Sequence, residues 1–184
     1  AAYKAFGEHE WTARLWAALT GFFGVLMVGF AGARLFGQRA GFFSALILGS
    51  SLLYAGIGHM STLDMGLTFC MTLGLLGFLL AQQGEPATRE SRLWMGLAWA
   101  AMGLAFLSKG LIGLVLPAAA LVAYALIKRD ISFLKRLGPV GGIAIMLAIA
   151  LPWVIAVSMA NPEFPRFFFI HEHFQRFLTQ VHHR

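Results

Sequence analysis

Six long apolar stretches, separated by short connections, dominate this 184-residue chain. They cover residues 15–33, 40–58, 62–81, 93–108, 110–127 and 137–159. A helix needs about 20 apolar residues to cross a bilayer. Leu, Ala, Gly and Phe dominate the stretches, without the two-residue alternation of an outer-membrane strand. Because a helix satisfies its own backbone hydrogen bonds in lipid, the sequence predicts an all-α, polytopic bundle with about six membrane spans.

The composition supports this class and excludes a water-soluble core. Hydrophobic residues make up 59% of the chain and charged residues only 12%. A soluble domain of this length needs far more polar surface. Since the connections are short, we expect residues 1–160 to form one membrane unit. Pro117 and Pro152 lie inside predicted spans, where proline can kink a helix.

The basic residues predict how the chain is oriented. Of 14 Lys and Arg, eight lie in three connections, at Arg34, Arg39, Arg89, Arg92, Lys128, Arg129, Lys135 and Arg136. The alternate connections contain only Lys109. Basic connections favour the cytoplasm, so residues 59–61, 108–110 and 161–184 are expected on the outer side. The net charge of +6 is then a topology signal, and we expect no nucleic-acid partner.

Residues 161–184 predict an amphipathic helix that lies flat in the outer interface. Asn161 is a suitable cap, Pro162 suits the first helical position and Glu163 favours the first turn. The apolar face contains Phe167, Ile170, Phe174, Phe177 and Leu178. At about 15 residues, the helical part is too short to span a bilayer comfortably.

Three ionisable residues lie at the outer ends of predicted spans. Asp64 could orient a substrate or hold a cation, although an acid there could also act as a helix cap. Lys109 could pair with Asp64 or bind a phosphate, or could simply anchor the interface. Because one topology places both at the same depth, we expect them to interact. His59 is a candidate substrate-binding or proton-carrying residue, with a hydrogen-bonded interface histidine as the alternative.

The sequence HEHFQR, residues 171–176, forms a second polar cluster. His171 is a candidate ligand for a divalent metal, the only cofactor considered. A helix turns His171 and His173 about 200° apart, so a metal would need other ligands. Glu172 and Arg176 could form a helical salt bridge, or could bind substrate, with Arg176 holding a lipid phosphate in its forked guanidinium.

Five motifs follow one another in a characteristic order: AFGEHEWTARL, HMSTLDM, FLSKGLIGLVLP, LPW and NPEF…EHFQRFL. This succession resembles the lipid-linked-sugar glycosyltransferases related to protein O-mannosyltransferases. Within that superfamily, it is most similar to the bacterial enzymes that transfer 4-amino-4-deoxy-L-arabinose to lipid A. The resemblance covers nearly the whole chain.

The resemblance implies a C-type glycosyltransferase in the bacterial inner membrane, with its active site facing the periplasm. A polyprenyl-phosphate sugar would be the donor and lipid A the acceptor, with inversion at the anomeric carbon; the sequence leaves the oligomeric state open, a monomer included. Asp64, Lys109 and Arg176 would take supporting roles, Arg176 toward the donor phosphate. The main catalytic acid would lie in a loop before Ala1, and a periplasmic domain would follow Arg184. We therefore expect this piece alone to be inactive.

Three alternatives stay open from the sequence. A related enzyme could transfer a sugar to another lipid or to protein. A transporter or flippase is a second possibility, although transporters place ionisable groups near the bilayer midplane. A non-catalytic scaffold is the third, but it would leave the polar residues of the outer side without a shared reason to be there.

Overall fold

The structure is a computed structural model that describes residues 7, 9–60, 62–83, 88–129 and 131–164. Within these residues all regular secondary structure is helical, which confirms the predicted all-α class. The helices are α2 (Glu10–Phe36), α3 (Gln38–Ser50), α4 (Leu52–His59), α5 (Asp64–Gln83), α6 (Arg89–Lys109), α7 (Ile112–Lys128), α8 (Ser132–Lys135) and α9 (Pro139–Ala160).

A helix occupies each predicted span, and the chain is a multi-pass membrane protein. By length and composition, α2, α5 and α9 can each cross a membrane, and α3 with α4 can form a fourth, bent span. α7 has 17 residues and α6 carries charged residues at both ends. For these two helices, membrane crossing stays a prediction. α6 begins at Arg89, four residues before the predicted span, because the Thr88 hydroxyl accepts a hydrogen bond from the Ser91 backbone N–H.

The second predicted span is not one straight helix, a break that the sequence analysis did not predict. α3 and α4 meet at an angle of 59°, on either side of Ser51, whose backbone is extended. The Tyr54 hydroxyl donates a 3.0 Å hydrogen bond to the Gly21 carbonyl and so ties α4 to α2. The two prolines inside predicted spans do not interrupt their helices, since α7 continues through Pro117 and α9 through Pro152.

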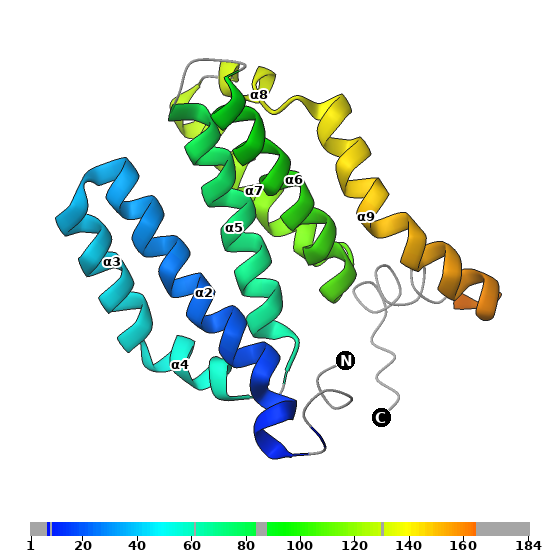
Figure 1. Cartoon of the computed structure of the whole chain (residues 1–184). Coiled ribbons are helices and arrows are strands. Elements are labelled where there is room, and N and C mark those ends of the chain that lie inside the picture. The colour runs from blue at the N-terminus through cyan, green and yellow to red at the C-terminus, as the bar shows by residue number, and fades with distance from the viewer. Residues whose placement is uncertain (1–6, 8, 61, 84–87, 130, 165–184) are drawn as a thin grey trace.

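The long helices lie side by side in the order α3, α2, α5, α6, α9, with α7 behind α5 and α6 (Figure 1). α3 runs antiparallel to α2, and α6 runs antiparallel to α5, whereas α2 and α5 point in the same direction, as do α6 and α9 (Figure 1). One end of the bundle contains the described basic residues of the three basic connections, and we call it the basic end. They are Arg34, Arg39, Arg89, Arg92, Lys128, Arg129 and Arg136. The opposite end contains the first residue of α5, and we call it the Asp64 end. This arrangement agrees with the alternation from which the orientation was predicted.

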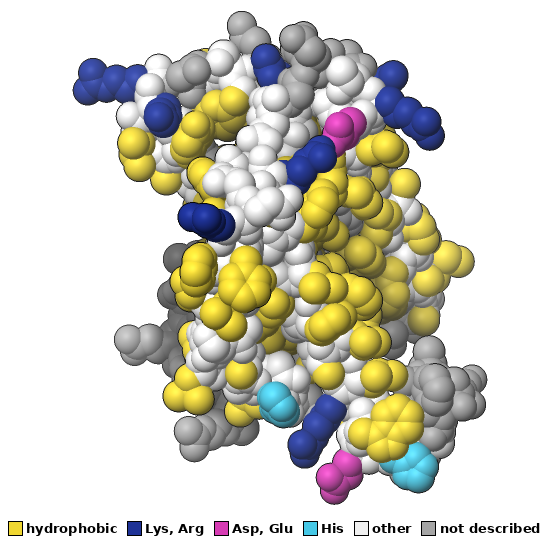
Figure 2. Space-filling model, turned by 60° about the vertical axis from the view of Figure 1, so that its left-hand side comes forward, with side chains coloured by type: hydrophobic (Ala, Val, Ile, Leu, Met, Phe, Trp, Pro, Cys, Tyr) yellow, Lys and Arg dark blue, Asp and Glu magenta, His cyan; other side chains and the backbone are white. Residues whose placement is uncertain are grey.

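Small side chains fill the interior of this bundle, and large ones cover its outside. Ala17, Ala31, Ala101 and Ala105 are each at most 2% exposed. Large apolar side chains cover the outer surface between the two ends, with Ile127 82% exposed (Figure 2). Because lipid tails are as apolar as Leu, small residues let membrane helices approach closely while bulky ones face lipid. The packing is that of a membrane protein.

Candidate functional site

An ion pair at the Asp64 end joins two helices that are neighbours in the bundle. Asp64 is the first residue of α5, and Lys109 is the last residue of α6. Because α5 and α6 run antiparallel in close contact, these two ends meet. Lys109 Nζ donates a hydrogen bond to Asp64 Oδ1. The predicted pairing of Asp64 with Lys109 is therefore confirmed, whereas their roles in catalysis stay predictions.

The turn after Lys109 holds the ammonium group at the end of the bundle. Gly110 follows it with a φ of 69°, a left-handed conformation that glycine adopts without strain. Its N–H donates a 2.7 Å hydrogen bond to the Phe106 carbonyl. Three residues later, a side chain on Gly113 would lie 2.6 Å from the Ala105 carbonyl oxygen. α7 can therefore return directly along α6, as the predicted hairpin at residues 108–110 requires.

The ion pair is accessible to a ligand from the membrane surface. The Asp64 side chain is 43% exposed and the Lys109 side chain 46% exposed. Helix α5 also has its positive dipole end at Asp64, which favours the ionised carboxylate. An ion pair this exposed to water contributes only about 0.2–1 kcal/mol to stability. A second anion, such as a phosphate, can thus compete for Lys109 at low cost.

His59 is the third candidate residue at this end, and it is not bonded to Asp64 or Lys109 in the described structure. In the described part of the chain, the His59 ring bonds only within α4, where Nδ1 lies 2.7 Å from the Ala55 carbonyl oxygen. This is the hydrogen-bonded interface histidine that the sequence analysis gave as the alternative. Its proposed part in substrate binding stays a prediction.

The remaining predicted site residues, His171, Glu172 and Arg176, lie outside the described residues. The amphipathic helix over residues 161–184 lies mostly outside them too. Among the described residues, no group of three or more His, Cys, Asp or Glu side chains could hold a metal ion. The metal-ligand role of His171 therefore stays a prediction.

A second ion pair, at the basic end, was missed by sequence reasoning. Arg34 Nη2, at the end of α2, donates to Glu90 Oε1, in the first turn of α6. The sequence analysis used Arg34 only as a topology signal. The rule that predicted the Asp64–Lys109 pair applies here as well, because the end of α2 and the start of α6 lie on the same side. The opposite charges of Arg34 and Glu90 were the available signal.

The Asp64 end also contains a buried polar group that the sequence did not single out. The Thr12 side chain in α2 is 3% exposed, and its hydroxyl has no hydrogen-bond partner among the described residues. Nearby, α2 and α5 approach so closely that a side chain on Gly66 would lie 2.5 Å from Trp16 Nε1. α2 is therefore fixed firmly against the helix that carries Asp64.

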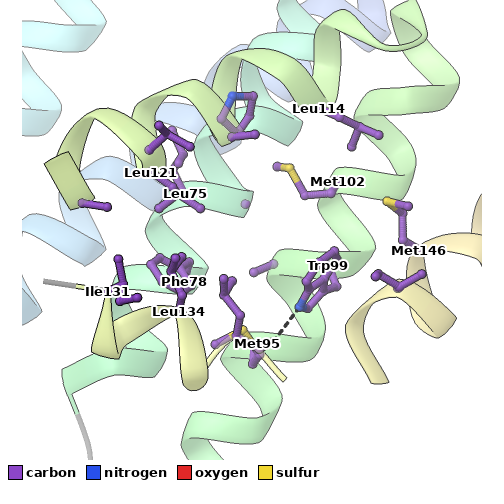
Figure 3. Close-up of a pocket in the computed structure, with 18 of the residues that line it drawn as sticks. Leu75, Phe78, Met95, Trp99, Met102, Leu114, Leu121, Ile131, Leu134 and Met146 are labelled. Carbon is purple, nitrogen blue, oxygen red and sulfur yellow. Dashed lines mark hydrogen bonds between the residues drawn. The ribbon is translucent and has the colours of Figure 1, made fainter. Parts of the chain in front are cut away.

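An apolar cavity of about 660 Å³ lies between α5, α6, α7 and α9, and α8 also contributes to its lining. Met95, Met102 and Met146 project toward it, and the Trp99 indole N–H donates a 2.9 Å hydrogen bond to the Leu137 carbonyl (Figure 3). Among the residues that the structure describes, no charged side chain lines the cavity. It suits hydrocarbon rather than polar chemistry, and it is separate from the Asp64–Lys109 pair.

Comparison with known proteins agrees with this fold. Residues 1–155 match the family described as dolichyl-phosphate-mannose-protein mannosyltransferase. The chain is 44% identical to ArnT from Cupriavidus metallidurans in its crystal structure bound to undecaprenyl phosphate, with a TM-score of 0.91. That match covers 95% of this chain and 32% of ArnT.

Similar relatives include two bacterial proteins named undecaprenyl phosphate-alpha-4-amino-4-deoxy-L-arabinose arabinosyl transferase. The one from Aeromonas salmonicida is 37% identical over 177 residues, which are 95% of this chain and 32% of the relative. The second, numbered 2 in its name and from Pseudomonas fluorescens, is 34% identical, over 94% of this chain and 29% of the relative. The chain thus spans about a third of the length of these relatives.

The helical bundle is that of a multi-pass membrane protein, and its likeness to ArnT shows the C-type glycosyltransferase fold. The chain belongs to the dolichyl-phosphate-mannose-protein mannosyltransferase family. The resemblance stated from the five sequence motifs is therefore confirmed.

Proposed function

We propose that this chain is part of a membrane glycosyltransferase that moves 4-amino-4-deoxy-L-arabinose from undecaprenyl phosphate to lipid A. The observation that carries the proposal is the 44% identity, over 95% of the chain, to a protein crystallised with undecaprenyl phosphate. The donor sugar follows from the names of the relatives. Lipid A as the acceptor follows from the motif resemblance alone.

The Asp64–Lys109 pair supports a location for this chemistry at the Asp64 end. By the positive-inside rule, that end faces the periplasm of a bacterial inner membrane. Inverting transfer needs a base for the acceptor hydroxyl and cationic groups for the departing phosphate. Lys109 is a cation at headgroup depth, and Asp64 fixes its position. Arg176 is proposed as a second phosphate ligand, with His59 and Glu172 in supporting contact with substrate.

The proposal is tested with the full-length protein in a bacterium that lacks its own aminoarabinose transferase. Mass spectrometry of lipid A should show the added aminoarabinose, and resistance to cationic peptides should return. Lipid A that stays unmodified, while the protein is present in the membrane, would contradict the proposal. Because the family description names protein as an acceptor, the same cells should also be examined for glycosylated protein.

A transporter is the second candidate, and the break between α3 and α4 favours it. Transporters bind substrates at broken helices near the bilayer midplane. In the described part of this chain, however, the ion pairs lie at the two ends of the bundle, and the apolar cavity has no charged side chain in its lining. Net uptake of the donor lipid without sugar transfer in proteoliposomes would favour the transporter.

A further inference from the structure

A groove at the basic end combines a cationic mouth with an apolar floor. It has a volume of about 430 Å³ and lies between α2 and α3. Arg34 and Gln38 line its mouth, and Leu26, Phe30, Phe42 and Ala45 line the part toward the middle of the bilayer. Arg34 and Leu26 are eight residues apart on one helix, which is about 12 Å. The groove therefore covers most of one leaflet, whose hydrocarbon is about 15 Å thick.

The Arg34 guanidinium is held in place at the mouth of this groove. Its Nη2 bonds Glu90 of α6, and its Cζ lies 5.8 Å from the centre of the Phe30 ring. The Phe30 ring in turn packs against Trp94, with 5.7 Å between ring centres. A guanidinium has five N–H donors, so the bond to Glu90 leaves others for a second anion. The side chain is 51% exposed and can be reached from the membrane surface.

The charge around the groove favours an anion. Arg39, Arg89 and Arg92 are exposed at the same end, where basic side chains gather above the apolar surface (Figure 2). Glu90 is the one acidic residue that the structure describes at this end. The leaflet at the basic end is the cytoplasmic one, which is rich in anionic lipids, and basic pockets between helices on this side bind lipid headgroups.

We propose that the groove binds one anionic phospholipid of the cytoplasmic leaflet. Its phosphate contacts Arg34, and one acyl chain lies along Leu26, Phe30 and Phe42. The lining changes from polar at the mouth to apolar toward the middle of the bilayer, and this favours a lipid as the ligand. A free phosphate would contact only Arg34 and leave the apolar floor without a partner. The net positive charge of the basic end around the mouth decides for an anionic headgroup over a zwitterionic one. The proposal does not depend on the transferase activity.

The test measures thermal unfolding of the full-length protein in detergent during titration with dioleoyl phosphatidylglycerol. Dioleoyl phosphatidylcholine, which has the same acyl chains, is the reference. Phosphatidylglycerol should raise the Tm more than phosphatidylcholine does. Arg34→Gln removes a charge-assisted contact, so it should raise the phosphatidylglycerol concentration at half-effect about tenfold or more.

Two variants at the same end separate lipid binding from general effects. Arg92→Gln removes the same charge outside the groove and should keep the wild-type titration. Glu90→Gln breaks the ion pair but keeps Arg34, and it should bind phosphatidylglycerol as well as or better than wild type. If Arg92→Gln raises the phosphatidylglycerol concentration at half-effect as much as Arg34→Gln does, the lipid is attracted only by the overall positive charge of the surface, and the groove is not the binding site. If Glu90→Gln raises it as much, the ion pair and not the lipid explains the effect, and the proposal is wrong.

The apolar floor is tested with neighbouring phenylalanines of α3. Phe42 lines the groove, whereas Phe43 does not, and both are more than half exposed. Phe42→Ala should weaken stabilisation by either lipid, and Phe43→Ala should not. Equal stabilisation of wild type by the two lipids, or by inorganic phosphate at the same concentration, would overturn the lipid site.

Discussion

Breaking the Asp64–Lys109 pair tests whether the Asp64 end carries the chemistry. Asp64→Asn and Lys109→Met each leave the partner charge without its counterion at the membrane surface. Since both side chains are close to half exposed, the coupling between them should fall within the range of about 0.2–1 kcal/mol measured for exposed pairs. At the upper part of this range, about 0.5–1 kcal/mol, this corresponds to about two- to fivefold in rate.

The assay is sugar transfer by the full-length protein, with the four members of a double-mutant cycle compared at equal folded concentration. If the pair acts as a unit, each single variant should lower the transfer rate by more than the two- to fivefold of the coupling. The double variant should then lower the rate by less than the product of the two single effects. Glu90→Gln is the matched control, because it breaks an ion pair of similar exposure at the opposite end and should leave transfer near normal.

A charge swap separates position from chemistry. The variant with Asp64→Lys and Lys109→Asp can form the same ion pair with its ends exchanged. If Lys109 acts only by pairing, the swap restores transfer beyond either single variant. If the ammonium must face the donor phosphate, the swap stays as impaired as Lys109→Met. Fully additive losses in the cycle, or a Glu90→Gln loss equal to that of Asp64→Asn, would refute the reasoning.

Three further predictions concern orientation, phosphate binding and packing. In a cysteine-free background, Leu63→Cys should react with an impermeant thiol reagent in whole cells and Gln83→Cys should not; the reverse would invert the proposed orientation. Arg176→Ala should weaken undecaprenyl phosphate binding by the full-length protein, and Arg176→Lys should do so less, whereas unchanged affinity would leave Arg176 as a salt-bridge residue. Gly113→Ala should destabilise by about 1–3 kcal/mol, because its side chain would meet the Ala105 carbonyl, while Gly141→Ala, with open space around it, should be neutral or slightly stabilising in the same denaturation assay.

The sequence predicted those parts of the structure that depend on span order and orientation. The Asp64–Lys109 pair is the clearest case, since alternating spans bring the start of one helix and the end of the next to the same side. The break at Ser51 could not be predicted in this way. The helix beyond the break is bonded to α2 through the Tyr54 hydroxyl and the Gly21 carbonyl, a contact between residues 33 positions apart that no local pattern shows. The prolines, which are the usual local signal for a bend, lie in helices that continue through them.

The groove at the basic end was hidden from the sequence for a different reason. Its lining is divided between one face of α2 and one face of α3, so that the groove exists only once the two helices have packed together. Arg34 was read as one of several equivalent basic residues. Only the packing of Phe30 against Trp94 and the bond to Glu90 distinguish it from Arg92. A charge count predicts the side of the membrane, but not which guanidinium is held in place.

The α5–α6 hairpin is fastened at both of its ends, which bears on the order in which the chain is assembled. At the basic end the Ser91 hydroxyl bonds the Ala81 carbonyl, and at the other end Lys109 bonds Asp64. The Lys109–Asp64 bond can form only after α6 has carried Lys109 across the membrane to the side on which Asp64 already lies. We therefore expect the hairpin to close once α6 has crossed the membrane, without needing α9. A ribosome-bound chain that extends far enough beyond α6 for this helix to have left the ribosome, but stops before α9 is inserted, should already resist extraction of α6, and Lys109→Met should weaken the resistance.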